Sequence, residues 1–251
     1  MLDAIRNWRI RRLVARRPIP EAAWQRALRH CGPARRMGGS DQASLRVLAT
    51  LFLDQKSLEP VQGLELGEID RVLLAVHACV PILKLGIDWY EGWHSVIVYP
   101  DAFIPNRTRT DAAGVVHQDH AALAGEAWGR GPVILSWSDV LAIGRRPGSN
   151  VVIHEMAHKL DMLNGSANGF PPLHRRMERR TWTETFSRVW DRLQDAHDQG
   201  LELPIDPYAL TNPAEFFAVA SEQFFEAPAA LREHLPDVHR QLVQFYRQEP
   251  V

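Results

Sequence analysis

The sequence His154-Glu155-Met156-Ala157-His158 has the pattern H-E-x-x-H. Residues four apart on an α-helix lie on one face about one turn apart, so the two imidazoles can bind a single ion. Neutral imidazole suits Zn²⁺, and a catalytic zinc site keeps one coordination position open for water. Glu155 follows the first histidine and can reach that water as a general base. The pattern therefore predicts the metal-binding helix of a zinc-dependent peptidase.

The residues on either side favour a buried helix. Residues 147–150 read Pro-Gly-Ser-Asn, which is typical of a turn, and Ser149 or Asn150 can cap the helix that follows. Most of the helix circumference is apolar, through Val151, Val152, Ile153, Met156, Ala157, Leu160 and Leu163. A core helix with two hydrogen-bonded histidines is the alternative, but it leaves three polar groups on an apolar helix unexplained.

The composition is that of an ordinary globular protein. The chain has 251 residues, of which 45% are apolar and 24% are charged, and its formal net charge is −1. This balance gives no reason to expect direct binding to nucleic acid or to an anionic membrane. Cys31 and Cys79 are the only cysteines, which excludes a disulfide framework and a cysteine-rich zinc site.

No segment of the sequence predicts export or membrane insertion. No apolar run approaches the roughly 20 residues that span a bilayer. Residues 1–18 lack the uninterrupted apolar core of a signal peptide. We therefore expect a cytoplasmic protein, and we expect it to be a monomer.

The first 30 residues predict a basic helical region. Arginines alternate there with apolar residues, namely Arg6, Arg9, Arg11, Arg12, Arg16 and Arg17 with Ile5, Trp8, Ile10, Leu13 and Val14. Such a helix can dock on a membrane surface or on an acidic partner. We favour the more common arrangement, in which the arginines form a solvated face over an apolar stripe.

The remaining hydrophobic pattern changes between helical and strand-like periods. Helices are expected over residues 42–56, 65–86, 181–197, 213–225 and 229–247, with a kink or break at Pro81. Strands are expected over residues 93–99 and 133–137, and residues 101–131 predict loops with one short strand. The sequence therefore predicts a mostly helical α+β fold with a small mixed sheet behind the H-E-x-x-H helix. We divide it into an N-terminal helical region, residues 1–60, packed on a metallopeptidase domain, residues 61–251.

Two histidines hold zinc poorly, so a third ligand is required elsewhere. One class of zinc peptidases extends the motif to H-E-x-x-H-x-x-G-x-x-H. In this chain, Asp161 stands at the glycine position of that motif and Asn164 at its third histidine position. The class is therefore excluded. The other class takes a glutamate from a downstream helix. Residues 212–222 form the candidate helix.

Two glutamates on that helix, Glu215 and Glu222, compete for the ligand role. They are seven residues apart and so lie on roughly the same face. Glu215 could instead complete a capping box with Asn212. Glu222 could instead accept a hydrogen bond from a ligand imidazole, a role for which Asp161 also competes. The helix pattern alone leaves the choice open.

Several segments together resemble the Mlc titration factor A family. They are residues 131–137 (GPVILSW), 154–162 (HEMAHKLDM), 206–209 (DPYA), 212–219 (NPAEFFAV) and 244–246 (QFY). The resemblance covers most of the chain from about residue 60 and is weakest in the first 50 residues. It implies a zincin-like fold of the gluzincin type, related to the catalytic domain of anthrax lethal factor.

The resemblance also implies roles for individual residues. His154, His158 and Glu215 would bind Zn²⁺, with Glu155 as the base. Tyr208 would lie at the site, where its phenol can donate to developing negative charge.

The implied activity is that of a peptidase, of aminopeptidase type, acting on a peptide or protein substrate. The Gly-x-Met-Glu-Asn stretch of well-known zinc aminopeptidases is absent upstream of His154, so endopeptidase action stays open. The implied partner is a Mlc-like transcriptional repressor. The alternative is a catalytically silent zinc-containing module that sequesters a repressor. In the peptidase interpretation, the strand over residues 133–137 could be a sheet edge that pairs with extended substrate.

Overall fold

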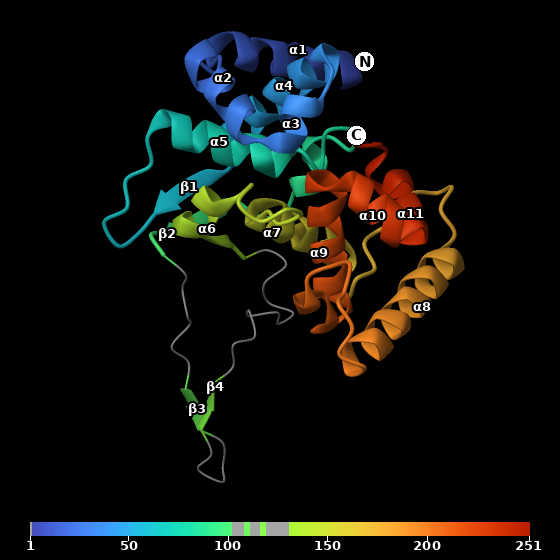
Figure 1. Ribbon diagram of the computed structural model, residues 1–251. Helices are drawn as coiled ribbons and strands as arrows, with labels where there is room; N and C mark the ends of the chain where they lie inside the picture. Colours follow the sequence, from blue (N-terminus) through green and yellow to red (C-terminus); the bar gives the residue numbers. More distant parts are fainter. Residues whose placement is uncertain (1, 102–107, 111–115, 119–130) are drawn as a thin grey trace.

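The computed structural model describes residues 2–101, 108–110, 116–118 and 131–251 (Figure 1). Helices dominate this part of the chain: α1 (Leu2–Arg16), α2 (Glu21–His30), α3 (Gly32–Arg36), α4 (Gly39–Gln55), α5 (Glu68–Cys79), α6 (Trp137–Ala142), α7 (Val151–Asp161), α8 (Arg179–Asp198), α9 (Pro213–Glu226), α10 (Pro228–His234) and α11 (Pro236–Tyr246). The 3₁₀ helices are η1 (Ile87–Tyr90), η2 (Met162–Asn164) and η3 (Pro207–Leu210). The expected α+β class is confirmed.

A three-stranded sheet lies beside α7, the helix that carries H-E-x-x-H. Its strands are β1 (Ser57–Pro60), β2 (Ser95–Tyr99) and β5 (Val133–Ser136), in the order β1-β2-β5. Both pairings are parallel, so the expectation of a mixed sheet was wrong for the described strands. The connection from β1 to β2 runs through α5, and such a crossover is what parallel pairing requires. The strand β1 was not predicted because it is four residues long and ends in proline.

Prolines set the ends of several helices. The helix expected over residues 65–86 is α5, which ends at Cys79; the break expected at Pro81 is confirmed, and the helix does not continue to residue 86. The single last helix expected over residues 229–247 is instead two helices, because Pro236 ends α10 and begins α11. The strand expected to reach Trp137 stops one residue earlier, where the Ser136 side chain accepts a hydrogen bond from the Asp139 N–H and caps α6.

Two short strands occur in the region where one was expected. They are β3 (Thr108–Thr110) and β4 (Val116–Gln118), which pair antiparallel. Most of the remaining residues between 101 and 131 lie outside the described part of the chain. None of the helices that the structure describes is long and apolar enough to cross a membrane.

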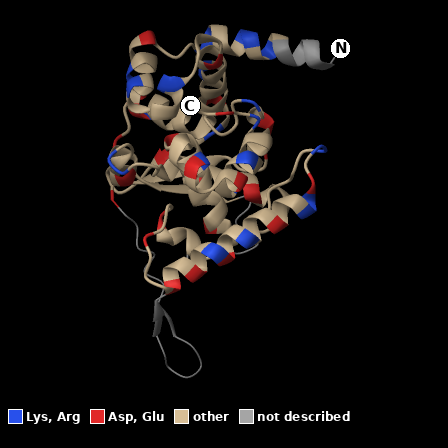
Figure 2. Cartoon of the chain, turned by 45° about the vertical axis from the view of Figure 1, so that its right-hand side comes forward, with Lys and Arg blue, Asp and Glu red and all other residues tan. Residues whose placement is uncertain are grey.

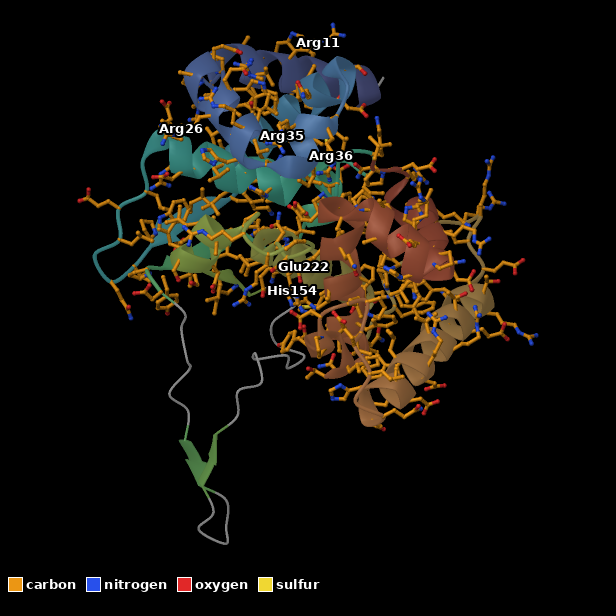
Figure 3. All side chains as sticks on the ribbon, viewed as in Figure 1. Arg11, Arg26, Arg35, Arg36, His154 and Glu222 are labelled. Carbon is orange, nitrogen blue, oxygen red and sulfur yellow. The ribbon has the colours of Figure 1, made fainter. Side chains whose placement is uncertain are left out.

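The N-terminal helices carry the basic surface that the sequence predicted (Figure 2). Ile10 and Leu13 of α1 pack on the hydrophobic core, whereas Arg9, Arg11 and Arg12 are exposed. Figure 3 shows Arg11 at the far side of the molecule from His154 and Glu222. This arrangement agrees with a solvated arginine face over an apolar stripe.

The pair of helices α7 and α9 occupies the centre of the C-terminal half. Phe216, Phe217, Phe224 and Phe225 of α9 are almost fully buried. At the middle of α9, the Tyr246 hydroxyl donates to Ser221 Oγ (2.8 Å), which donates in turn to the Phe217 carbonyl. Burial on nearly all sides makes α9 a rigid support for any group that it presents to α7.

The loop after η2 is held between α7 and α9 at Gly169. The carboxylate of Asp161 accepts hydrogen bonds from the N–H groups of Asn168 (2.8 Å) and Gly169 (2.7 Å). Gly169 has φ +76°, and a Cβ atom there would lie 2.4 Å from the Pro213 carbonyl oxygen. Only glycine fits this backbone without a shift in α9.

We expect Gly169→Ala to destabilise the fold by roughly 2–5 kcal/mol, since the left-handed conformation and the backbone clash both oppose the methyl group. The matched control is Gly200→Ala, whose glycine has φ +71° with nothing within 4 Å of the added Cβ. The control should lose only about 1–2 kcal/mol. Denaturant unfolding followed by circular dichroism measures both losses, and equal losses would contradict the proposed clash.

Candidate metal centre

The start of α7 is fixed by Asn150, one of the two capping residues that the sequence offered. Its side chain is fully buried, and its Oδ1 accepts a hydrogen bond from the Ile153 N–H (3.1 Å). The apolar residues of the helix then face the core, among them Val152, Ile153, Met156, Ala157 and Leu160. His154, Glu155 and His158 are only partly buried. The cap and the apolar face together turn His154 and His158 toward α9.

Three side-chain atoms converge between α7 and α9. Nε2 of His154 lies 3.1 Å from Nε2 of His158 and 3.0 Å from Oε2 of Glu215. The separation between His158 Nε2 and Glu215 Oε2 is 3.3 Å. Ligand atoms bound tetrahedrally at about 2.0–2.1 Å from zinc are separated by about 3.3 Å. The spacing of these atoms therefore fits a single zinc-sized ion.

The electrostatics of this cluster also favour a cation. Burial lowers the pKa of His154, but hydrogen bonds to Glu215 and Glu222 outweigh it and raise the pKa to about 10. Burial raises the pKa of Glu215, but the two histidines outweigh it and lower the pKa to about 2. The carboxylates thus create a site where positive charge is stabilised. Two imidazole nitrogens and one carboxylate oxygen are the donor set of many catalytic zinc sites.

Glu222 takes a different position from Glu215. Its Oε1 accepts a hydrogen bond from Nδ1 of His154 (2.7 Å), and its Oε2 accepts one from the Asn150 N–H (2.5 Å). A proton held on Nδ1 leaves the lone pair of Nε2 directed at the cluster. The structure thus brings both glutamates to the site, with Glu222 supporting His154 from behind.

The predicted capping box at the start of α9 is only half formed. Asn212 Oδ1 accepts a hydrogen bond from the Glu215 N–H (3.0 Å). The Glu215 carboxylate lies against the two histidines instead of completing the box at the Asn212 N–H. The cap therefore fixes the backbone of Glu215 and leaves its side chain available to a metal.

Asp161 supports a loop, and within the described part of the chain it makes no hydrogen bond to an imidazole. Its Oδ2 accepts the N–H groups of Asn168 and Gly169. Its Oδ1 and His158 Nδ1 are both buried without a hydrogen-bond partner among the described residues. Of the two candidates for supporting a ligand histidine, Glu222 is the one in hydrogen-bond contact.

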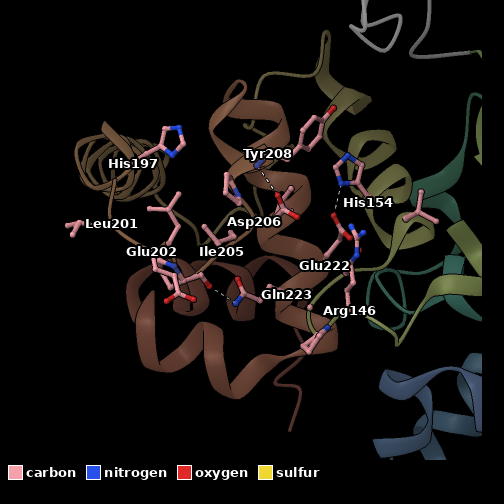
Figure 4. Close-up of a pocket in the computed structure, with 18 of the residues that line it drawn as sticks. Arg146, His154, His197, Leu201, Glu202, Ile205, Asp206, Tyr208, Glu222 and Gln223 are labelled. Atoms are coloured by element: carbon pink, nitrogen blue, oxygen red, sulfur yellow. Dashed lines mark hydrogen bonds and ion pairs between the residues drawn. The ribbon is translucent and has the colours of Figure 1, made fainter. Parts of the chain in front are cut away.

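Tyr208 lies beside the cluster, on η3. The Asp206 carboxylate accepts a hydrogen bond from the Tyr208 N–H (2.9 Å), which fixes the start of this short helix. The Tyr208 ring centroid is 6.1 Å from that of His154, and Figure 4 shows the two rings side by side. Burial and the nearby carboxylates of Glu215 and Glu155 raise the pKa of the phenol. The phenol therefore keeps its proton at neutral pH and can donate a hydrogen bond.

A cleft of about 770 Å³ opens beside His154, Glu155 and Tyr208 (Figure 4). One wall is the turn before α7, and the other is the segment from the end of α8 to η3. Arg146 and His197 also line it, although no sequence motif marks either of them. His117 and His120 are three residues apart in the sequence, a spacing that two metal ligands could have, but their side chains lie outside the described part of the chain.

An α+β fold with two helical histidines, a facing glutamate and an adjoining cleft defines a metallopeptidase-like protein. The chain matches the family described as glucose-regulated metallo-peptidase M90 over residues 5–247, and it belongs to that family.

Curated relatives carry the name Mlc titration factor A. Those from Salmonella agona and Salmonella gallinarum are 41% identical to this chain over 213 residues. The relative from Escherichia fergusonii is 39% identical over 213 residues. Each alignment covers 84% of this chain and 80% of the relative. The resemblance seen in the sequence is confirmed.

Proposed function

We propose that this protein is a zinc-dependent peptidase in which His154, His158 and Glu215 hold the ion and Glu155 is the general base. The observation that supports it best is the convergence of three donor atoms, within 4.8 Å of one another, beside a cleft large enough for a peptide. Membership of a metallopeptidase family supports the same reaction class.

The chemistry divides among a few groups. A zinc ion, when bound, supplies Lewis-acid activation of water and of the substrate carbonyl. Glu155 lines the cleft next to His154 and accepts a proton from the attacking water. Glu155 then delivers this proton to the leaving amine. Tyr208, whose ring centroid lies 6.1 Å from that of His154, donates a hydrogen bond from its phenol to the oxyanion.

The edge of the sheet offers a place for the substrate backbone. Within the described strands, β5 pairs with β2 on one side and has no strand on the other. Lys159 Nζ donates a hydrogen bond to the Gly131 carbonyl (2.8 Å), which ties the start of β5 to the end of α7. An extended peptide added to this edge would have its carbonyl groups fixed relative to Glu155.

Aminopeptidase-type cleavage is part of this proposal. Asp206 lies two residues before Tyr208, lines the same cleft and is exposed. A carboxylate in this cleft can accept hydrogen bonds from the free α-amine of a substrate. Comparison of a free and an N-acetylated peptide of the same sequence distinguishes this mode from endopeptidase action.

Removing the metal tests the central proposal. We expect dialysis against a chelator to abolish hydrolysis of a small peptide panel, and about one equivalent of Zn²⁺ to restore it. Metal content is measured by atomic spectrometry and hydrolysis by liquid chromatography. Undiminished cleavage by metal-free protein would refute a metal-dependent reaction.

Tyr208→Phe should lower turnover by about 100-fold and leave KM nearly unchanged, since the hydroxyl acts on charge that develops only in the transition state. The phenyl ring keeps the packing against His154, so zinc content should stay the same. Steady-state kinetics provide the measurement. Unchanged turnover would remove Tyr208 from the mechanism.

The name of the relatives favours a second function. They are named for titration of Mlc. We propose that this chain likewise binds a Mlc-like transcriptional repressor, which places it in the cytoplasm with that repressor. Capture of the purified repressor by wild type and by Glu155→Gln tests this. Capture without any peptide hydrolysis by wild type would favour the silent binding module over the peptidase.

A further inference from the structure

Arg146 is a cation in the candidate active-site cleft that has no ionic partner among the described residues. Its guanidinium makes no hydrogen bond or ion pair with any residue that the structure describes. The side chain is exposed, and the cleft that it lines is the one that contains His154 and Glu155. The neighbouring Arg145 is equally exposed but does not line the cleft.

The backbone around Arg146 is well fixed. A bridge joins Ile143 to Arg146, and the Ser149 N–H donates to the Arg146 carbonyl (3.2 Å). Gly148 has φ +83°, and its added Cβ would lie 3.5 Å from Cγ of Gln223 on α9. The turn therefore packs on α9 and presents Arg146 at a constant place.

The packing of this turn on α9 allows its distance from the metal cluster to be measured along that helix. Gln223 lines the cleft, as does Val219 one turn earlier on α9. Because helical residues rise by 1.5 Å, Gln223 lies about 12 Å along the helix from Glu215. An extended peptide advances about 3.3 Å per residue, so about three to four residues span this length. A peptide of this length that starts at the metal cluster would reach the turn that carries Arg146.

We propose that Arg146 binds the carboxylate of a short peptide substrate, about three to four residues from the bond that is cleaved. Arginine binds carboxylates through two parallel hydrogen bonds, which gives both affinity and a fixed orientation. The carboxylate is the α-carboxylate at the substrate's C-terminus or an acidic side chain at the same place. The inference rests on the proposed peptidase function, and it makes Arg146 a substrate-positioning residue.

The test is a binding measurement that needs no turnover. Calorimetry on the zinc-loaded Glu155→Gln protein compares tetraalanine with a free C-terminus and tetraalanine amide. We expect the free acid to bind at least about tenfold more tightly. Arg146→Ala should reduce the ratio of the affinities for the free acid and the amide to within about twofold. Arg146→Lys should keep part of this ratio. The matched control Arg145→Ala should keep all of it.

A third peptide identifies the source of the carboxylate. Trialanyl-glutamyl amide has a blocked C-terminus and an acidic last side chain. If it binds as tightly as the free acid, and only when Arg146 is present, Arg146 binds a side-chain carboxylate as well as the α-carboxylate. If it binds as weakly as tetraalanine amide, the bound group is the α-carboxylate.

Three results would overturn the inference. They are equal binding of free acid and amides by the Glu155→Gln protein, a ratio that survives Arg146→Ala, and no binding of any of the peptides. Hydrolysis by wild type is measured separately. If wild type hydrolyses peptides but the free acid and the amide bind equally, only the role of Arg146 is refuted. If the free acid binds more tightly but wild type hydrolyses no peptide, only the peptidase proposal is refuted.

Discussion

Replacing Glu155 with glutamine is expected to abolish peptide hydrolysis while the protein keeps its zinc. The glutamate lines the cleft and is not one of the three converging donors. Glutamine has nearly the same shape but cannot accept a proton from water. General base catalysis contributes about 10²–10⁴-fold, so kcat should fall by at least that factor. Zinc content and kcat of both proteins are measured on the same preparations.

The matched control is Glu202→Gln, which changes a second carboxylate of the same cleft, one that is exposed. Glu202 lies on the wall between α8 and η3, away from the H-E-x-x-H helix. It should keep near wild-type kcat, which would show that the loss at Glu155 is not a general effect of cleft charge. Full activity of zinc-loaded Glu155→Gln would refute the base assignment. Zinc loss in that variant would instead make Glu155 important for the metal site.

The local features of the metal-binding helix could be predicted from the sequence. Its N-cap, its apolar face and the spacing of its histidines depend on neighbours within a few residues, and Asn150, Val152 and Met156 behave as expected. The helix ends at Pro81 and Pro236 also depend only on neighbouring residues. Our sequence analysis predicted the break at Pro81 but not the one at Pro236. Short elements such as β1 carry too few residues for a periodic pattern.

The choice between Glu215 and Glu222 could not be made from helix periodicity, because both lie on one face of α9. It depends on how α7 and α9 align. They run antiparallel, so that Glu215 meets His154 and His158 while Glu222 meets His154 and the N-terminus of α7. The resemblance to a known family implied Glu215, and its carboxylate is the one that lies beside both histidines. Arg146 could not be predicted because its position depends on a turn packing against a distant helix.

Replacing each of the three glutamates along this face of α9 (Glu215, Glu222 and Glu226) should lower the affinity for zinc by a different factor. Glu215→Ala removes a donor and should release the metal. Glu222→Ala leaves the donors in place but frees Nδ1 of His154, and loss of such a supporting hydrogen bond typically costs 10–100-fold in affinity. Glu226 is one step further away, since its carboxylate accepts from the Asn150 side chain (2.6 Å) and not from a histidine. Glu226→Gln should therefore have the smallest effect.

Competition with a chromophoric chelator measures the affinity of each variant, and circular dichroism shows that each is folded. We expect the loss at Glu215 to exceed the roughly 10–100-fold range of a supporting residue. A larger loss for Glu222→Ala than for Glu215→Ala would transfer the ligand role to Glu222. Only Glu215 lies within 3.3 Å of both histidines. Equal losses of zinc affinity at all three positions would therefore mean that the substitutions disturb the fold of the site and do not remove a ligand.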